Sequence, residues 1–421
     1  MKSSKTVRSR VTVPNQRFLI RTLLIGFFAC DRQARAQDIF APPPSAPDQT
    51  PAAVQQVNEM DVFAAPPETE SQPFKWGAFT LRPHPYYQFL YADGIQANTN
   101  QVANTAIQTI APGALLEMGQ HWTLDYTPTF SIYSNRQFSD AFGQTARLVG
   151  GTIYNDWVLG LTQGYSETDT ASATTGTQTR EQTFATSLGG SYTVNSKMSM
   201  DLGADQRIVS ADQFSSYREW STMDWFNYQF LPRLNTAVGV GGGYDDNQSG
   251  PDATFEQAQG RFNWRASNRI SFQIHGGVEI RQFLSGSGND LVNPIFDATI
   301  QYQPLELTRI SVTGQRTVSA SYLQSQVTET IEVSVDVNQR LLRQYFLDLN
   351  GGYQNVKYVS SVSTSTPSRR DDYYFLNVQL GRTFLRRGTI AILYRFSQDN
   401  SSEAGYNFTT HQVGFQIGYS Y

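Results

Sequence analysis

The sequence predicts an all-β fold, a transmembrane antiparallel up-and-down β-barrel of about 18 strands behind a disordered N-terminal tail. Three observations predict it. Segments that alternate apolar and polar residues fill the chain from Phe79 onward, their connections alternate between tight turns and longer polar loops, and the last segment ends on an aromatic residue. A barrel of 16 strands is the alternative, if a pair such as 144–168 is misassigned.

The composition suits a barrel that alternates lipid-facing and lumen-facing residues. Only 16% of the 421 residues are charged, whereas 13% are aromatic. The longest apolar run, Leu23 to Cys30, is much shorter than the ~20 residues of a transmembrane helix. A net charge of −4 offers no basic patch for nucleic acid. Cys30 is the one cysteine and lies in a segment expected to be removed, so we expect no disulfide or thiolate site in the mature chain.

Residues 1–36 are predicted to be a signal peptide. A basic region that begins at Lys2 precedes the apolar run, and Ala34-Arg35-Ala36 forms a small-x-small cleavage site. The mature chain would then start at Gln37. One alternative is a membrane anchor helix, for which the apolar run is short. The other is a lipoprotein modified at Cys30, for which Phe27 fits poorly at the third position before the cysteine.

Residues 37–75 are predicted to be a disordered Pro/Ala-rich tail in the periplasm, because they contain too little apolar surface to fold alone. The segment 38–43, Asp-Ile-Phe-Ala-Pro-Pro, is echoed at 61–67 by Asp-Val-Phe-Ala-Ala-Pro-Pro. The repeat is either a docking motif for a periplasmic partner or a chance repeat in a low-complexity linker. The barrel is assigned to residues 76–421.

Each barrel strand is expected to have one apolar and one polar face. In 122–132, for example, alternate residues from Trp122 to Ile132 form an apolar face, and those between them are Thr, Asp or Ser. In 327–338 Glu329 is the one charged residue on the apolar face. The strands are expected near 79–92, 104–118, 121–133, 144–154, 156–168, 180–194, 196–210, 216–230, 232–246, 253–266, 269–283, 292–304, 306–319, 326–338, 341–358, 370–383, 386–398 and 406–421.

Loop length also favours a membrane barrel over a soluble sandwich. Tight turns such as Gly119-Gln120 alternate with longer loops, which are expected at 93–103, 134–143, 169–179, 284–291, 359–369 and 399–405. Short periplasmic turns and longer external loops produce this alternation, and an even strand number places both chain ends in the periplasm.

The C-terminal strand carries the clearest local signal. Apolar residues at alternate positions up to a terminal aromatic are typical of the signal that the outer-membrane barrel-assembly machinery reads. The residues concerned are Val413, Phe415, Ile417, Tyr419 and Tyr421.

Residues 81–421 resemble the family named putative beta-barrel porin type 2. The resemblance rests on Leu81-Arg82-Pro83, 244–247 (Tyr-Asp-Asp-Asn), 302–305 (Tyr-Gln-Pro-Leu), 314–318 (Gly-Gln-Arg-Thr-Val), 370–373 (Arg-Asp-Asp-Tyr) and 400–402 (Asn-Ser-Ser). At 91–94 the chain has Tyr-Ala-Asp-Gly where the family has Tyr-Asp-Asp-Asn. The resemblance implies an outer-membrane barrel and a link to exopolysaccharide biosynthesis and export.

Charged residues on the polar faces are candidates for the lumen, where rings of charge set solute selectivity. The alternative is that they are ion pairs that keep the interior polar and the wall rigid. The candidates are His275, Glu279, Arg281, Arg218, Arg261, Arg265, Arg316, Glu332, Asp336 and Arg395. Asp245, Asp246, Asp371 and Asp372 lie near strand ends and are weak candidates for a shared divalent cation, with a polar loop rim as the alternative.

These features predict a porin-like channel for hydrophilic solutes in the cell outer membrane, with a link to exopolysaccharide export through the resemblance. The alternative is a non-conducting structural or adhesive barrel with ligand-binding loops. The expected partners are outer-membrane lipid and lipopolysaccharide, the barrel-assembly machinery, and polysaccharide or its export machinery. Neither a cofactor nor catalysis is expected, because His84, His121, His275 and His411 look like isolated strand residues.

Overall fold

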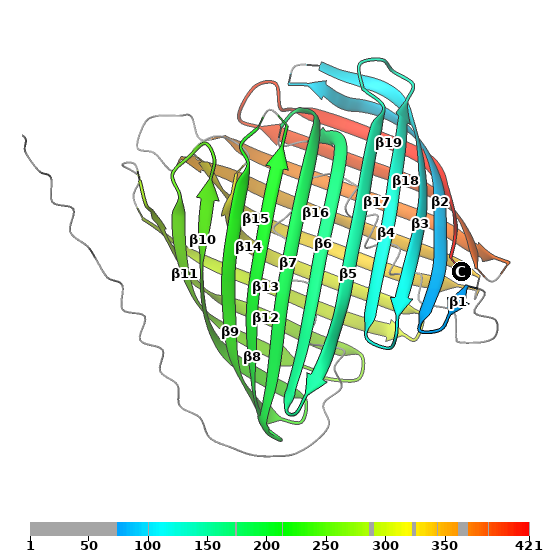
Figure 1. The fold of residues 1–421 in the computed structure, drawn as a ribbon. Helices are drawn as coiled ribbons and strands as arrows, with labels where there is room; N and C mark the ends of the chain where they lie inside the picture. Colours follow the sequence, from blue (N-terminus) through cyan, green and yellow to red (C-terminus); the bar gives the residue numbers. More distant parts are fainter. Residues whose placement is uncertain are drawn as a thin grey trace, which may run out of the picture.

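The computed structural model is a closed barrel of 18 long antiparallel strands with one short strand added at its start (Figure 1). It describes residues 74–420 except 100, 173–174, 213, 286–289, 322–325, 343, 361–368 and 386. The predicted signal peptide with Ala34 and Ala36, the tail up to residue 73, and Tyr421 lie outside these residues. In the described part of the chain, no helix is long and apolar enough to cross a membrane.

The long strands match the predicted segments closely, because each begins where the alternation of apolar and polar residues resumes after a turn. The strand bounds are β1 (Lys75–Trp76), β2 (Phe79–Asn98), β3 (Gln101–Met118), β4 (Trp122–Tyr133), β5 (Ala141–Tyr154), β6 (Trp157–Ser172), β7 (Thr177–Asn195), β8 (Met198–Ala211), β9 (Tyr217–Leu231), β10 (Leu234–Asn247), β11 (Ala253–Trp264), β12 (Ile270–Phe283), β13 (Leu291–Leu305), β14 (Thr308–Ala320), β15 (Gln326–Leu341), β16 (Tyr345–Ser360), β17 (Arg370–Phe384), β18 (Gly388–Ser401) and β19 (Phe408–Tyr419).

The barrel closes by pairing of its first and last long strands. β19 runs antiparallel to β2, with Phe415 opposite Phe89, and their rings stack with centroids 5.8 Å apart. The other long strands pair with their neighbours in sequence, so that β2–β9 form the front wall in Figure 1 and β10–β19 the rest. The predicted count of 18 is confirmed, and β5 and β6, which the alternative of 16 would remove, form a regular pair.

The wall has an apolar outer face and a polar inner face. Across β17, β18 and β19, the ladder places Leu380, Ile392 and Phe415 side by side, with 46%, 63% and 38% of their surface exposed. The residues next to these three in sequence have their side chains on the opposite face and point inward. Val413, Phe415, Ile417 and Tyr419 of the predicted assembly signal share the outer face, while their role as a signal stays a prediction.

The connections differ between the two ends of the barrel. We call the end where residues 74 and 420 lie the terminal end and the opposite one the loop end. The terminal end has the turns 119–121, 155–156, 196–197, 232–233, 265–269, 306–307, 342–344 and 385–387. The loop end has 99–100, 134–140, 173–176, 212–216, 248–252, 284–290, 321–325, 361–369 and 402–407.

Two of the predicted loops are mostly strand. The expected loop 93–103 contains the end of β2 and the start of β3, and 169–179 contains the ends of β6 and β7. A bulge between Ala92 and Ile95 breaks the alternation in β2, which made this part look irregular. Gly94 permits the bulge, because its φ is +82° and an added Cβ would lie 2.2 Å from the Thr409 carbonyl oxygen.

We expect Ile392→Arg to destabilise the barrel by about 2–4 kcal/mol in lipid, because it places a charge on the apolar face. Gln379→Arg on the neighbouring strand β17 is the matched control; its side chain points inward, so we expect a change within about 1 kcal/mol. Urea titration of folding into phospholipid vesicles measures both. Equal losses would contradict the assignment of the two faces.

Candidate functional site: the lumen wall and a covered pocket

Most of the predicted lumen residues lie on the inner face. On β12, His275, Glu279 and Arg281 alternate with Ile274, Val278 and Ile280, which are exposed on the outside. Across the ladder, His275 faces Arg261 of β11. Glu332 and Asp336 of β15 and Arg395 of β18 also point inward. Their role in selectivity stays a prediction.

Three of the predicted lumen arginines lie elsewhere. Arg218 shares the outer face of β9 with Trp220. Its guanidinium lies 3.7 Å from the Asp246 carboxylate. Arg316 lies between the outward Phe296 and Ile331. Arg265 is in the turn after β11. The prediction assumed that a charge in a strand points away from lipid, but outward charges are stabilised here by partners on the same face.

An example of such a partner is Glu329, the charged residue on the apolar face of β15. Its carboxylate lies 3.6 Å from the Arg316 guanidinium and 3.8 Å from the Lys357 amine. A second outward cluster joins Arg180 of β7 to Glu167 of β6, which also accepts hydrogen bonds from Gln144 at 2.8 Å and the Tyr165 hydroxyl at 3.0 Å. The alternation of apolar and polar residues within one strand does not show which residues of the neighbouring strands lie beside it. The sequence analysis therefore did not predict these clusters.

Arg281 is the centre of the most buried charged cluster on the inner wall. Its Nη1 lies 2.5 Å from Asp245 Oδ2, and its Nε donates to Glu279 Oε1 at 3.0 Å. The three residues expose 1%, 0% and 2% of their surface. Gln257 donates to the second oxygen of Glu279 at 2.7 Å, and the guanidinium lies 4.8 Å from the Phe255 ring centre. This arrangement favours the structural interpretation of these three charges.

Arg261 organises a second network nearer the terminal end. Its Nη2 donates to Asp201 Oδ2 at 2.8 Å and to Asn227 Oδ1 at 2.6 Å. Ser191 donates to the other oxygen of Asp201 at 2.9 Å. The guanidinium lies 4.5 Å from the Trp225 ring, which in turn contacts His275. The network spans β7 to β12 and holds its charges close to the wall.

A third network crosses the opposite wall and is made mainly of amides. Gln315 donates to Glu332 at 3.1 Å, Asn350 donates to Asp336 at 2.6 Å, and Asn377 donates to Asn350 at 3.1 Å. No basic side chain contacts Glu332 or Asp336 among the ion pairs of the described residues. These two carboxylates are therefore the stronger candidates for acting on passing ions.

The weak metal candidates do not come together. Adjacent residues of a strand face opposite sides, so Asp245 and Asp371 point inward while Asp246 and Asp372 point outward. Each contacts an arginine, as Asp371 does through a two-point contact with Arg369 that includes a 2.9 Å hydrogen bond. Within the described residues, no group of three or more His, Cys, Asp or Glu is placed to hold a metal ion.

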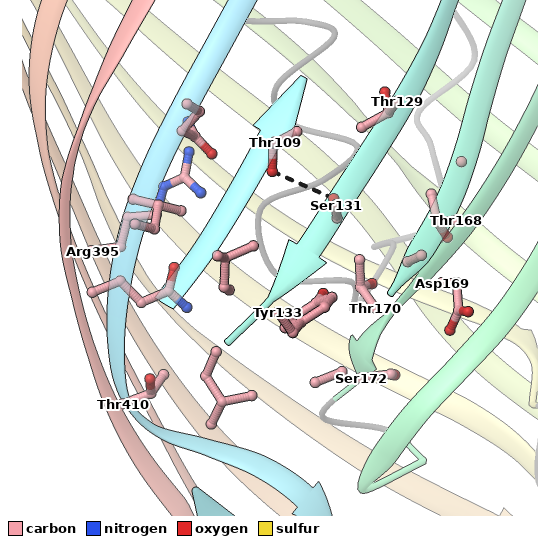
Figure 2. A pocket seen from close by; sticks show the side chains of 18 of the residues that line it. Thr109, Thr129, Ser131, Tyr133, Thr168, Asp169, Thr170, Ser172, Arg395 and Thr410 are labelled. Carbon is pink, nitrogen blue, oxygen red and sulfur yellow. Dashed lines mark hydrogen bonds between the residues drawn. The ribbon is translucent and has the colours of Figure 1, made fainter. Parts of the chain in front are cut away.

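A pocket lies against the inner wall of β2–β6, β18 and β19, towards the loop end (Figure 2). Hydroxyl and amide side chains form most of its lining, and Arg395 is its one basic lining residue. Figure 2 shows Arg395 and Thr410 on one side, with Tyr133, Thr170 and Ser172 on the other. Thr109 and Ser131 are linked across β3 and β4 at 3.4 Å. The sequence did not predict this site, because its residues come from seven strands.

Loops and strand ends cover the pocket at the loop end. Thr177 of β7 donates to the carbonyl of Ala97 in β2 at 3.3 Å, although the four strands β3–β6 separate β2 from β7 in the sheet. Gln96 donates to the carbonyl of Gly405 at 2.7 Å. Below these contacts, Phe138 from the loop 134–140 packs against Ala92, Ile95 and Ala103. We call these contacts the cover.

Comparison with known proteins finds a family that part of this barrel resembles. Residues 240–420 match the family model described as Putative beta-barrel porin 2. The match confirms the family resemblance, and with the closed barrel it identifies a porin-like outer-membrane β-barrel. No curated protein matches the sequence.

Several solved outer-membrane proteins resemble the fold weakly. OpdL of Pseudomonas aeruginosa has a TM-score of 0.45 and 12% identity, over 82% of this chain and 99% of its own. OccK3 (OpdO) of the same organism has a TM-score of 0.43 and 13% identity, and the match covers 81% of this chain and 95% of OccK3. The siderophore receptor PirA of Pseudomonas aeruginosa has a TM-score of 0.40 and 9% identity, and the match covers 83% of this chain and 81% of PirA. Similarities this low carry no information about the solute.

We expect Arg281→Gln to destabilise the barrel by about 3–5 kcal/mol, because it leaves Asp245 and Glu279 buried without their cation. Arg218→Gln, whose side chain is 60% exposed, should cost less than about 1 kcal/mol. Urea midpoints in vesicles compare the two variants. A similar small loss in both would show that the buried cluster is not structural.

Proposed function

We propose that this barrel is a passive channel for hydrophilic solutes. The observation that carries the proposal is the polar inner face of the closed wall, where charges are held by partners in the wall itself. Arg281 and Arg261, for example, are bound by carboxylates beside them. A barrel of 18 strands is wide enough for an aqueous path unless loops fold inward.

We propose that the terminal end faces the periplasm, with the signal peptide removed and residues 37–75 forming a periplasmic tail. The short turns at this end support the orientation. The loop end would then contact lipopolysaccharide, and outward pairs such as Arg218–Asp246 would lie near its charged headgroups. The outward residues of β19 would be read by the barrel-assembly machinery.

We propose transport without catalysis, in a protein linked to exopolysaccharide export. The export link rests on the family resemblance. The placement of two histidines supports the proposal, since each has a neighbour in the wall: His84 Nε2 lies 3.1 Å from Asp125, and His411 Nδ1 lies 3.1 Å from the Tyr394 hydroxyl.

Single-channel recording of the refolded mature chain in a planar bilayer tests the channel. We expect discrete conductance steps that are interrupted by anionic or neutral oligosaccharides if a polysaccharide is the solute. A folded, heat-modifiable barrel that gives no steps would contradict the channel and favour a structural role.

We further expect the double variant Glu332→Gln, Asp336→Asn to shift the reversal potential in a salt gradient towards anion selectivity. Asp246→Asn removes a charge from the outer face and is the matched control, with no shift expected. An equal shift in both would mean that the lumen carboxylates do not set selectivity.

A further inference from the structure

The terminal end of the barrel carries a strip of basic side chains that the proposed channel does not require. The strip runs from the β7–β8 turn to the ends of β14 and β15, whereas the turns after β3 and β5 contain no lysine or arginine. The loop end has the opposite balance, because carboxylates outnumber basic residues in its connections. We call the strip the basic rim. Its members are Lys197, Arg233, Arg265, Arg269, Arg309 and Arg340.

The barrel supplies few carboxylates to the basic rim. All six side chains are exposed, and none of them takes part in an ion pair among the described residues. In sequence, Glu306 is the one carboxylate in the turns from β7–β8 to β17–β18.

Two members of the basic rim point into the mouth of the barrel from neighbouring strands. Arg309 of β14 lies opposite Asn338 of β15, and Arg340 is two residues further along the same face. Diagonal neighbours on one face of a sheet are within reach of long side chains, so these two like charges favour an anionic partner. The inward carboxylate beside them is Asp348, opposite Asn338 on β16, which is one negative charge against two positive charges.

Exposed leucines accompany the basic residues at the same turns. Leu342 and Leu385 follow β15 and β17 and expose 87% and 82% of their surface. Their φ angles are +47° and +48°, a conformation that costs a residue with a Cβ about 1–2 kcal/mol and that glycine would adopt more easily. Leu231 and Leu305, beside the β9–β10 and β13–β14 turns, expose 53% and 64%. A partner for this end should therefore combine negative charge with apolar side chains.

The chain's own N-terminal segment has this composition. Residues 37–73 contain six carboxylates, equal in number to the side chains of the basic rim, and no lysine, arginine or histidine. Each copy of the repeat, 38–43 and 61–67, places an aspartate two residues before a phenylalanine. Aspartate provides the charge that arginine binds, and the phenylalanine ring provides the apolar surface that an exposed leucine lacks. The proposed channel leaves this repeat without a role.

The segment enters the barrel at the right end and is long enough. The Phe74 carbonyl accepts a hydrogen bond from Leu81 of β2 at 3.0 Å, which places the start of the described chain at the terminal end. Counted through β19, strands spaced about 4.8 Å apart place β16 about 20 Å and β12 about 40 Å from β2. Phe63 and Phe40 are 11 and 34 residues from Phe74, so the chain can span up to about 35 Å and about 110 Å.

We infer that residues 37–73 dock on the basic rim of their own barrel. The second copy of the repeat lies at Arg340 and Leu342, and the first copy lies at the β9–β10 and β11–β12 turns, beside Arg265 and Arg269. Exposed ion pairs contribute only about 0–1 kcal/mol each. The covalent link offsets this weakness, because it holds the segment at a high effective concentration near the rim.

Docking has a consequence for solutes at this mouth. The bound carboxylates neutralise the basic rim and so reduce its attraction for anions that approach the lumen. The inference goes beyond the proposed channel and needs only the proposed removal of residues 1–36.

Distances between two spin labels test the docking in the folded mature chain, which has no cysteine of its own. One label is placed on Ala41→Cys in the first copy of the repeat. The other is placed on Asn268→Cys in the β11–β12 turn or on Gln120→Cys in the β3–β4 turn. Gln120 is near the start of the described chain, because the Gly119 N–H donates to the Ala78 carbonyl at 2.7 Å. A segment that is only tethered is on average nearer Gln120, whereas a docked segment is nearer Asn268.

Double electron–electron resonance in phosphatidylcholine vesicles should give a short, narrow distance to the label in the β11–β12 turn. Salt at about 1 M should reduce this population about threefold or more, because it screens exposed charges. The variant Arg233→Gln, Arg265→Gln, Arg269→Gln should reduce it similarly. Phe40→Ser should also reduce it, because it removes the apolar part of the first copy.

The matched control removes three exposed arginines that lie towards the loop end and should leave the distances unchanged. It is the variant Arg136→Gln, Arg218→Gln, Arg370→Gln. A first copy that stays nearer Gln120, distances that salt, the rim variant or Phe40→Ser leave unchanged, or an equal change in the control would overturn the inference. Heat-modifiability on gels confirms that each variant is folded.

The vesicles contain neither another protein nor anionic lipid, so a short distance reports docking on the barrel itself. These distances do not depend on conductance. A docked segment on a barrel that does not conduct would refute the channel alone, and a conducting barrel with an undocked segment would refute the docking alone.

Discussion

The structure depends on one constraint: in lipid, every backbone N–H and C=O of a spanning segment must be bonded within the protein. A sheet meets this requirement when it has no free edge. Pairing of β2 with β19 removes the two edges that the long strands would otherwise leave. The outer face of that pair, with Phe89 stacked on Phe415, therefore continues the apolar surface without a gap.

Closure also explains how charges are distributed. With the outer face committed to lipid, alternation sends half of each strand's side chains into a shared interior, where cross-strand neighbours become partners. Arg281 thus joins residues that are far apart in sequence, such as Asp245. The same rule permits outward charges where a neighbouring strand offers the opposite sign, as Glu329 does for Arg316.

Strand positions were predictable from sequence, because period-two alternation is a property of consecutive residues. The extent of β2 was not, because the bulge at Ala92–Ile95 shifts the alternation part-way along the strand. The sequence analysis assigned Arg218 and Arg316 to the lumen because they are charged. The face on which each side chain lies depends instead on how its strand pairs with the neighbouring strands. The covered pocket was beyond sequence reasoning, since Gln96, Thr170 and Thr410 meet only after the sheet closes.

The most direct test of an aqueous lumen inside an apolar wall is labelling of single cysteines along β13 in lipid vesicles. The chain's one cysteine, Cys30, lies in the predicted signal peptide, so the mature protein provides a clean background. A charged, membrane-impermeant thiol reagent should modify Thr299→Cys and Gln301→Cys rapidly and spare Ala298→Cys and Ile300→Cys. Uniform labelling, or none at the inward positions, would contradict a water-filled barrel with two distinct faces.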